Sequence, residues 1–209
     1  MANPRAELIA TARALQPAGL NKGTSGNVSV RDGDGFLITP TGLPYDTLVP
    51  DDIPRMALDG TPNGRRQPSS EWRFHRDLYA ARPEAGAVLH AHSPFAVSLA
   101  CLRRDIPPFH YMIARFGGDT VRCADYAIFG SAELSTAAMQ AMAGRKGCLL
   151  ANHGLLVAGR DLTESFALAV ELEELCEQYW RACQLDHPVL LTPAEMRAVQ
   201  ERFRGYGQQ

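Results

Sequence analysis

The stretch from Val88 to Pro94 (Val-Leu-His-Ala-His-Ser-Pro) constrains the fold of this chain more than any other. It belongs to a short apolar run bounded by Gly86 and Pro94, which is typical of a buried β-strand. Residues two positions apart in a strand share a face, so His90 and His92 are expected to point the same way. Two imidazoles on one face can bind the same metal ion. The sequence therefore predicts a sheet that carries part of a metal site.

Segments with strand and helix character alternate along the chain, separated by turn residues. Helices are expected where apolar residues recur every three or four positions behind a capping residue. The expected ranges are 4–16, Ser69 or Ser70 to about 82, 95–102, 131–143, 162 to just before His187, and 193 to Gly205. Strands are expected at short apolar runs between turns, at 28–31, 36–39, 55–58, 88–92, 109–115, 120–124 and on either side of Asn152-His153-Gly154. This interleaving predicts an α/β fold, one domain over residues 1–209 with a central mixed sheet and helices on both faces.

Composition is that of a soluble globular protein. Of the 209 residues, 45% are hydrophobic and 21% are charged, and the formal net charge is −2. This balance argues against a generic nucleic-acid or membrane surface. No apolar stretch is long enough for a membrane span, and the N-terminus lacks the apolar core of a signal peptide. The five cysteines include no CxxC pair, so we expect reduced thiols and a cytoplasmic protein.

A third histidine adds to the metal-ligand pattern. His153 lies in the predicted turn between two apolar strands, beside Gly154, where a side chain faces a cleft rather than the core. A single histidine in such a turn is often only a structural hydrogen-bonding residue. With His90 and His92 in the same chain, a ligand role is favoured. Three neutral imidazoles with one open position are the pattern of a catalytic zinc site, although other divalent ions also bind imidazole.

Glu71 is the candidate acid or base. It is expected in the first turn of a helix, near the sheet edge that carries the histidines. A carboxylate there often only complements the helix dipole, but beside a metal ion it can take a proton from bound substrate. Both interpretations stay open from the residues alone. His75, on the same helix face, is interpreted as structural, His110 as a hydrogen-bonded core residue and His187 as a surface residue.

Three short polar loops offer hydrogen-bond donors for an anion: Gly23–Asn27, Thr41-Gly42 and Ser69-Ser70. Each alone is typical of a turn or a helix cap. The third is expected at a helix N-terminus, where free backbone N–H groups and the helix dipole favour a negative charge. The GxxxxGK[ST] pattern of a nucleotide-binding loop is absent. Together the loops predict a site for the phosphate group of a small substrate.

This ordered set of motifs resembles the class II aldolase and adducin superfamily, and within it the L-fuculose-1-phosphate aldolase branch. The matching stretches run along the whole chain and keep their order and spacing: 19–31, 37–42, 68–75, 87–92, 107–118, 126–130 and 152–155. The resemblance implies the fold of that superfamily, with a mostly antiparallel sheet. It also implies a cyclic homotetramer with active sites between subunits.

The resemblance also implies roles for residues of this chain. His90, His92 and His153 would hold Zn²⁺, and Glu71 would be the catalytic acid or base and, in the empty enzyme, a further metal ligand. Tyr111 would act as a proton donor at the aldehyde oxygen in the site of a neighbouring subunit. The other implied positions would bind the substrate phosphate (Gly26, Asn27, Thr41, Gly42, Ser69 and Ser70) or line the aldehyde side (Phe129 and Tyr206).

The activity implied by the resemblance is that of a metal-dependent aldolase, an aldehyde-lyase. It would reversibly cleave a ketose 1-phosphate similar to L-fuculose 1-phosphate into dihydroxyacetone phosphate and an aldehyde, through a metal-stabilised ene-diolate. A Lewis acid makes a Schiff-base lysine unnecessary. The only two lysines of the chain, Lys22 and Lys146, lie in glycine-containing turns and do not suit that role.

Alternatives to the aldolase remain open at this point. After His92 the chain has Ser93-Pro94-Phe95, which is more similar to the epimerase and dehydratase branches of the superfamily. The same metal site would then serve a pentulose 5-phosphate 4-epimerase or a ketose 1-phosphate dehydratase. A scaffold domain like the adducin head would share the fold. It predicts broken ligand positions, however, and all three histidines and the glutamate are present.

Overall fold

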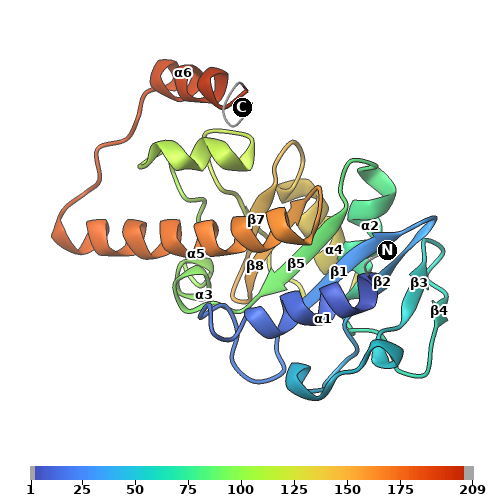
Figure 1. The fold of residues 1–209 in the computed structure, drawn as a ribbon. Coiled ribbons are helices and arrows are strands. Elements are labelled where there is room, and N and C mark those ends of the chain that lie inside the picture. The colour runs from blue at the N-terminus through green and yellow to red at the C-terminus, as the bar shows by residue number, and fades with distance from the viewer. Residues whose placement is uncertain (1–2, 205–209) are drawn as a thin grey trace.

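Eight strands form one sheet in the computed structural model, which describes residues 3–204 (Figure 1). From one edge to the other they are β4 (Pro62–Asn63), β3 (Arg55–Ala57), β2 (Gly35–Ile38), β1 (Asn27–Asp32), β5 (Ala87–Ala91), β8 (Gly154–Gly159), β7 (Gly147–Leu150) and β6 (Cys123–Ala124). Neighbouring strands are antiparallel except β6 and β7, which are parallel. The mixed, mostly antiparallel sheet expected from the sequence is confirmed.

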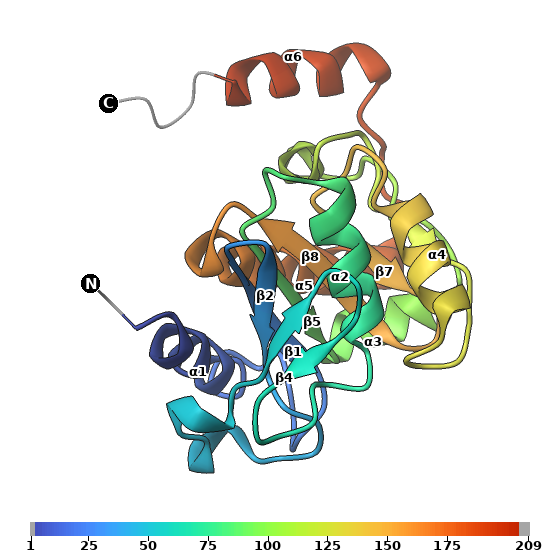
Figure 2. The ribbon, with the colours of Figure 1, turned by 90° about the vertical axis from the view of Figure 1, so that its right-hand side faces the viewer.

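Helices cover both faces of this sheet. α1 (Pro4–Ala14), α3 (Pro94–Ala100) and α5 (Leu162–Leu185) pack on one face, and α2 (Trp72–Ala81) and α4 (Ala132–Ala141) pack on the other. Figure 2 shows the sheet between α1 on one side and α2 and α4 on the other. The prediction of an α/β fold with helices on both faces is therefore confirmed.

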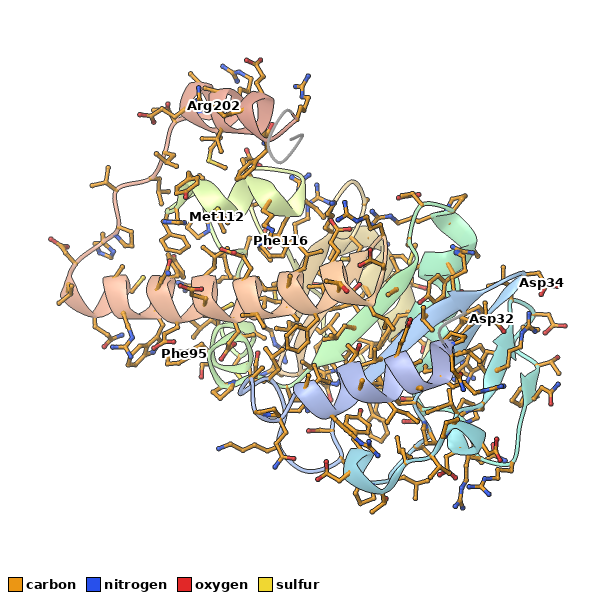
Figure 3. The ribbon with its side chains drawn as sticks, in the orientation of Figure 1. Asp32, Asp34, Phe95, Met112, Phe116 and Arg202 are labelled. Atoms are coloured by element: carbon orange, nitrogen blue, oxygen red, sulfur yellow. The ribbon has the colours of Figure 1, made fainter. Side chains whose placement is uncertain are left out.

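The last helix lies apart from the sheet. α6 (Pro193–Phe203) packs on the 3-10 helix η3 (Tyr111–Phe116), and Arg202 and Met112 mark the two elements in Figure 3. The other 3-10 helices of the described chain, Tyr45–Thr47 and Pro50–Asp52, follow β2. Within residues 3–204, no helix has the length and apolar character that crossing a membrane requires.

Polar side chains cap most of the long helices, as the helix predictions required. A side chain accepts a hydrogen bond from a backbone N–H of the first turn at Asn3, Ser131, Asp161 and Thr192. The expected cap of α2 is wrong, because Glu71 rather than Ser69 or Ser70 is its N-cap residue. Ser69 Oγ instead accepts a hydrogen bond from the backbone N–H of Glu71 (3.3 Å). This turn holds Glu71 just outside the helix.

Alternate residues of β5 face two separate apolar cores. Ala87, Leu89 and Ala91 belong to the core shared with α1 and α5, whereas Val88 belongs to the core shared with α2 and α4. His90 points to the same side as Val88, because residues two apart in a strand share a face. The strand therefore directs His90 toward α2, the helix that begins beside Glu71.

One predicted strand is a helix. The expectation of a strand at 109–115 is wrong, because Tyr111–Phe116 form the 3-10 helix η3. His110 is its N-cap residue, and the Nδ1 atom of His110 accepts a hydrogen bond from the backbone N–H of Met112 (3.3 Å). An apolar run this short does not distinguish a strand from a helical turn. The local cap by His110 decides between the two, and it also shows that His110 is not a core residue of a strand.

The N-terminus of α3 is held from α5. Glu173 accepts hydrogen bonds from the hydroxyl of Ser93 (2.6 Å) and from the backbone N–H groups of Phe95 and Ala96 (both 2.8 Å). A carboxylate at a helix N-terminus satisfies free donors and complements the helix dipole. This contact fixes the chain immediately after His92.

Glu173→Ala should lower the free energy of unfolding by about 2–4 kcal/mol, because it leaves the donors of a charge-assisted contact without an acceptor. Glu174→Ala is the matched control. This exposed neighbour only accepts a bond from Gln178, one turn along α5 (3.0 Å), so its loss should cost less than about 0.5 kcal/mol. Urea unfolding followed by circular dichroism measures both values. Equal losses in the two variants would contradict the anchoring role.

Candidate active site

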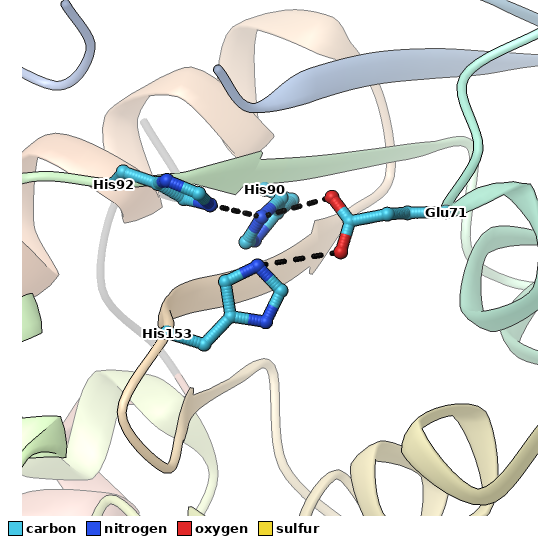
Figure 4. A group of neighbouring side chains, drawn as sticks. All are labelled: Glu71, His90, His92 and His153. Atoms are coloured by element: carbon cyan, nitrogen blue, oxygen red, sulfur yellow. Dashed lines mark hydrogen bonds and ion pairs between the residues drawn. The ribbon is translucent and has the colours of Figure 1, made fainter. Parts of the chain in front are cut away.

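Four side chains of metal-ligand type meet at one end of β5 (Figure 4). His90 is on β5, His92 follows the strand, His153 lies in the turn between β7 and β8, and Glu71 stands immediately before α2. One nitrogen or carboxylate oxygen of each lies within 4.8 Å of all the others. The structure thus brings together the histidines and the glutamate that the sequence singled out.

Strand geometry and a tight turn create this convergence. His90 and His92 point the same way, as residues two apart in extended backbone do, and their Nε2 atoms are 2.9 Å apart. Gly154 lets the turn that carries His153 approach β5 closely, since a Cβ at that position would collide with the carbonyl oxygen of Ala91. His153 is thereby held opposite the other two imidazoles.

The donor set fits a divalent metal ion. The Nδ1–H of His90 donates to the carbonyl oxygen of Leu155 (2.8 Å), which leaves its Nε2 lone pair for a ligand bond. The Nε2 atoms of His90 and His153 each lie 3.3 Å from an oxygen of Glu71. Atoms bound at about 2.0–2.1 Å to a common ion stand roughly 3 Å apart. Among the described residues, the buried Oε1 of Glu71 has no hydrogen-bond partner, so it remains available to a cation.

The side chains of the cluster shift one another's protonation. Burial acts to raise the pKa of Glu71, but the adjacent imidazoles, His90 above all, hold it at about 2. Burial acts to lower the pKa of His90, and Glu71 outweighs this effect and raises it. Burial, and then the nearby His90, lowers the pKa of His92 and of His153 to about 4. At neutral pH Glu71 is thus ionised and His92 and His153 are neutral, the forms that coordinate a metal ion.

The cluster borders a cavity of about 350 Å³. Glu71, His92 and His153 line it, whereas His90 is fully buried and does not. The walls include all the residues expected to bind phosphate: Gly26, Asn27, Thr41, Gly42, Ser69 and Ser70. The described lining includes no lysine or arginine. An anion there would be held by backbone N–H groups, hydroxyls and the start of α2.

The residues expected at the aldehyde side lie in different places. Phe129 lines the cavity and is 67% exposed. Tyr111 does not line the cavity of its own chain. It begins η3, is 50% exposed and stacks on Phe203, with 6.5 Å between the ring centroids. Tyr206 lies outside the described residues. The roles of these residues stay predictions.

Sequence reasoning did not single out Tyr126, Ala127 and Asn152, which also line the cavity. Asn152 has a φ of 54°, and its Oδ1 accepts a hydrogen bond from Arg103 (2.6 Å). The Arg103 guanidinium lies over the ring of Tyr126, 5.4 Å from its centroid. The available signal was an asparagine in a turn directly before a candidate ligand, because Asn adopts the left-handed region more readily than most residues.

A chain of buried hydrogen bonds runs from Glu71 between β1 and α2. Glu71 Oε2 accepts from the Asn27 amide (3.1 Å), and Asn27 Oδ1 meets Nε2 of His75 (2.5 Å). The other ring nitrogen of His75 meets Ser29 Oγ (2.7 Å), which contacts the Tyr79 hydroxyl (2.8 Å). All the members beyond Glu71 are at most 1% exposed. His75 is therefore a buried, hydrogen-bonded residue, as the structural interpretation of it expected.

Neither lysine lies at the cavity. Lys146 forms an ion pair with Glu164 (2.7 Å), and Lys22 is exposed and does not line the cavity. Neither is placed to form a Schiff base with a substrate bound beside the histidines, which agrees with the expectation from sequence.

Comparison with known proteins points to one family. Residues 6–180 match the family model described as Class II Aldolase and Adducin N-terminal domain. The chain is 55% identical over 200 residues to the 5-methylthioribulose-1-phosphate/5-deoxyribulose-1-phosphate aldolase of Rhodospirillum rubrum, covering 96% of this chain and 90% of that one. It is 43% identical over 206 residues to the L-fuculose phosphate aldolase of Escherichia coli, covering 96% and 94%. A solved structure of an L-fuculose 1-phosphate aldolase matches with a TM-score of 0.93 at 40% identity, over 98% of both chains.

Removal of one imidazole should weaken metal binding sharply. We expect His92→Ala and His153→Ala each to lower the affinity for Zn²⁺ more than about 100-fold, because even the outer-shell partners of zinc ligands contribute 10–100-fold. His187→Ala changes an exposed histidine outside the cluster and should bind like the wild type. Competition with a chromogenic chelator measures each constant. Wild-type affinity in His92→Ala would contradict the assignment.

His75 should make the fold sensitive to acid. Burial lowers its pKa from 6.5 to about 3, so between these values the unfolded chain binds a proton that the folded chain does not. The free energy of unfolding should fall as the pH drops through this window, by up to about 1.4 kcal/mol per pH unit from this residue. His75→Gln should remove that part of the slope. Urea unfolding at several pH values measures the difference, and parallel curves for the two proteins would refute it.

Proposed function

This chain belongs to the class II aldolase and adducin family, and we propose that it is a metal-dependent aldolase that reversibly cleaves a ketose 1-phosphate into dihydroxyacetone phosphate and an aldehyde. The strongest support is the cluster of Glu71, His90, His92 and His153. It borders a cavity that is lined by the polar loops expected to bind a phosphate group. Breaking a carbon–carbon bond next to a carbonyl group leaves negative charge that must be stabilised, and protons must be moved. A metal centre, a carboxylate and an anion site in one cavity suit these tasks.

His90, His92 and His153 hold the metal ion in this proposal, and Zn²⁺ is the ion that three imidazoles with an open position suit best. When bound there, the ion supplies a Lewis acid that stabilises negative charge on the oxygens of the substrate. Substrate reaches this centre from the cavity, since His92 and His153 line the cavity and His90 is buried.

Glu71 takes and returns the proton at the carbon next to the carbonyl group. It is only 7% exposed, lines the cavity and is ionised at neutral pH. Its Oε1 has no hydrogen-bond partner among the described residues, so this oxygen is free to accept a proton. In the empty enzyme the same carboxylate serves as a further metal ligand, because it lies within ligand distance of the imidazoles.

The substrate phosphate binds in the same cavity, at residues Gly26, Asn27, Thr41, Gly42, Ser69 and Ser70. Gly26 and Gly42 have φ values of 77° and 67°. Left-handed residues of this kind occur in the turns whose backbone N–H groups bind anions. The serines precede α2, whose N-terminus adds its dipole.

The protein is a homotetramer in this proposal, and Tyr111 serves the active site of a neighbouring subunit. Its ring is 50% exposed and lies outside the cavity of its own chain. A proton donor at this position can take part in the reaction only if the cavity of a neighbouring subunit lies next to it. There Tyr111 protonates the aldehyde oxygen, with Phe129 and Tyr206 lining the aldehyde side.

The aldehyde part of the substrate is short and apolar. Tyr126, Ala127 and Phe129 give the cavity an apolar lining that would suit such a group. The relative that is 55% identical is named for 5-methylthioribulose 1-phosphate and 5-deoxyribulose 1-phosphate. Both compounds end in a methyl group, as does L-fuculose 1-phosphate, which the sequence motifs suggested. A ketose 1-phosphate with a methyl or methylthio end therefore suits the site best.

Cysteine usage supports a cytoplasmic location for this reaction. All five cysteines are free thiols. Unpaired thiols, two of them exposed, suit a reducing compartment.

A panel of these three ketose 1-phosphates tests the proposal. The zinc-loaded protein should release dihydroxyacetone phosphate from at least one of them, detected by a coupled reduction that consumes NADH. Product identification separates the alternatives, because an epimerase or a dehydratase consumes substrate without releasing dihydroxyacetone phosphate. No release from any member of the panel would overturn the aldolase.

Glu71→Gln should lower kcat about 10²- to 10⁴-fold, because it removes a positioned base and leaves a side chain of the same shape. Exchange of the reacting hydrogen of dihydroxyacetone phosphate with deuterium from solvent, followed by NMR, should slow in parallel. Glu174→Gln, an exposed carboxylate on α5, is the matched control and should retain wild-type rates. Undiminished exchange in Glu71→Gln would assign the proton transfer to another residue.

A further inference from the structure

The hydrogen-bond chain from Glu71 to Tyr79 has one direction. A carboxylate only accepts hydrogen bonds, so Asn27 must turn its amide nitrogen toward Glu71 Oε2 (3.1 Å). The Asn27 oxygen then faces His75 and only accepts, so Nε2 of His75 carries the hydrogen. In the neutral ring Nδ1 accepts from Ser29 (2.7 Å), which leaves the Ser29 oxygen to accept from Tyr79 (2.8 Å).

We propose that His75 is a positioning residue that aims the amide of Asn27 at Glu71. The oxygen and nitrogen ends of an asparagine side chain are nearly equal in shape, so its neighbours decide its orientation. Ser69 Oγ also contacts the Asn27 nitrogen (3.0 Å). It does not favour either orientation of the Asn27 amide, because a hydroxyl both donates and accepts. The Nε2–H of His75 favours one orientation, with the Asn27 oxygen toward it, because an N–H group donates a hydrogen bond and accepts none. Without it, Asn27 loses the contact that holds its oxygen away from the carboxylate.

His75 is itself held firmly. It is fully buried on α2, its ring stacks on Phe74 with 4.8 Å between the centroids, and Ser29 of β1 holds its far nitrogen. Asn27 is equally fixed along the chain, because β1 pairs with β5 so that Asn27 stands opposite His90. The donor and the amide that it orients therefore belong to two regular elements, the helix α2 and the strand β1.

The aimed amide gives the two oxygens of Glu71 different roles. Oε2 is held by Asn27, whereas Oε1, which lies 3.3 Å from Nε2 of His153 but has no hydrogen-bond partner among the described residues, is left as the oxygen that exchanges the proton. This consequence rests on the proposed function. His75 acts only through Asn27, because it neither lines the cavity nor belongs to the metal-ligand cluster.

Two replacements of similar size at position 75 test the proposal. His75→Gln keeps an N–H group that can donate to Asn27, an arrangement that the accepting carboxylate of Glu71 still favours, and His75→Met keeps no donor. We expect His75→Met to lower kcat of the zinc-loaded enzyme about 10- to 100-fold with KM within about twofold, as for a misplaced catalytic group, and His75→Gln to stay within about threefold of the wild type. Ser165→Ala removes a buried hydrogen bond to the carbonyl oxygen of Ala87 (3.0 Å). It controls for lost stability and should keep the wild-type kcat.

A second measurement does not depend on turnover. In nitrogen-15 NMR spectra of the zinc-loaded protein at neutral pH, the His75 ring should be neutral with its hydrogen on Nε2. The side-chain amide hydrogens of Asn27 should exchange slowly with solvent in the wild type and in His75→Gln, and faster in His75→Met. The three proteins thus form a series in which orientation and kcat change together.

Several results would overturn the positioning role. These are a His75 hydrogen on Nδ1, a wild-type kcat in His75→Met despite a lower melting temperature, or a His75→Gln variant no more active than His75→Met. If the wild type cleaves no ketose 1-phosphate, the proposed function fails by itself. The tautomer of His75 and the exchange of the Asn27 amide then still decide whether His75 aims that amide.

Discussion

The pairing of β5 between β1 and β8 is the constraint on which the site depends. Both neighbours run antiparallel to β5, and their register places Asn27 and Leu156 on either side of His90. A shift of one residue would turn His90 to the opposite face of the sheet, because side chains alternate along a strand. The Leu155 carbonyl of β8 also accepts from Nδ1 of His90 and so selects the tautomer that leaves Nε2 for a metal ion. Backbone pairing therefore determines both the position and the chemistry of this ligand.

Local sequence patterns were sufficient to mark the candidate ligands one by one, and the family resemblance assigned them to a single metal site. His90 and His92 share a face because of a period of two, which is readable within one short run. His153 follows from a turn between apolar strands, and Glu71 from the start of a helix. The fold class follows in the same way from the alternation of segments. Each of these inferences needs only a few neighbouring residues.

Features that depend on contacts between distant segments could not be predicted in this way. Asn27 was expected only as part of a phosphate loop, yet its amide bonds Glu71, 44 positions away. Tyr126 reaches the cavity from a loop with no local signal. The strand expected at 109–115 was wrong because a short apolar run fits a helical turn as well, and the side chain of His110 decides for the helix. In each case a contact outside the pattern determines the result.

The absence of lysine and arginine from the described lining of the cavity has a consequence for how an anion arrives. The described side chains of the lining and a chain of net charge −2 therefore supply no long-range attraction for a phosphate, and the proposed metal ion is the positive charge beside the cavity. The loops themselves act only when the phosphate reaches their N–H groups, a few ångströms away. Mobile ions screen such short contacts weakly. The contribution of the loops would therefore change little with ionic strength, and they would select among anions by shape and donor geometry rather than by total charge.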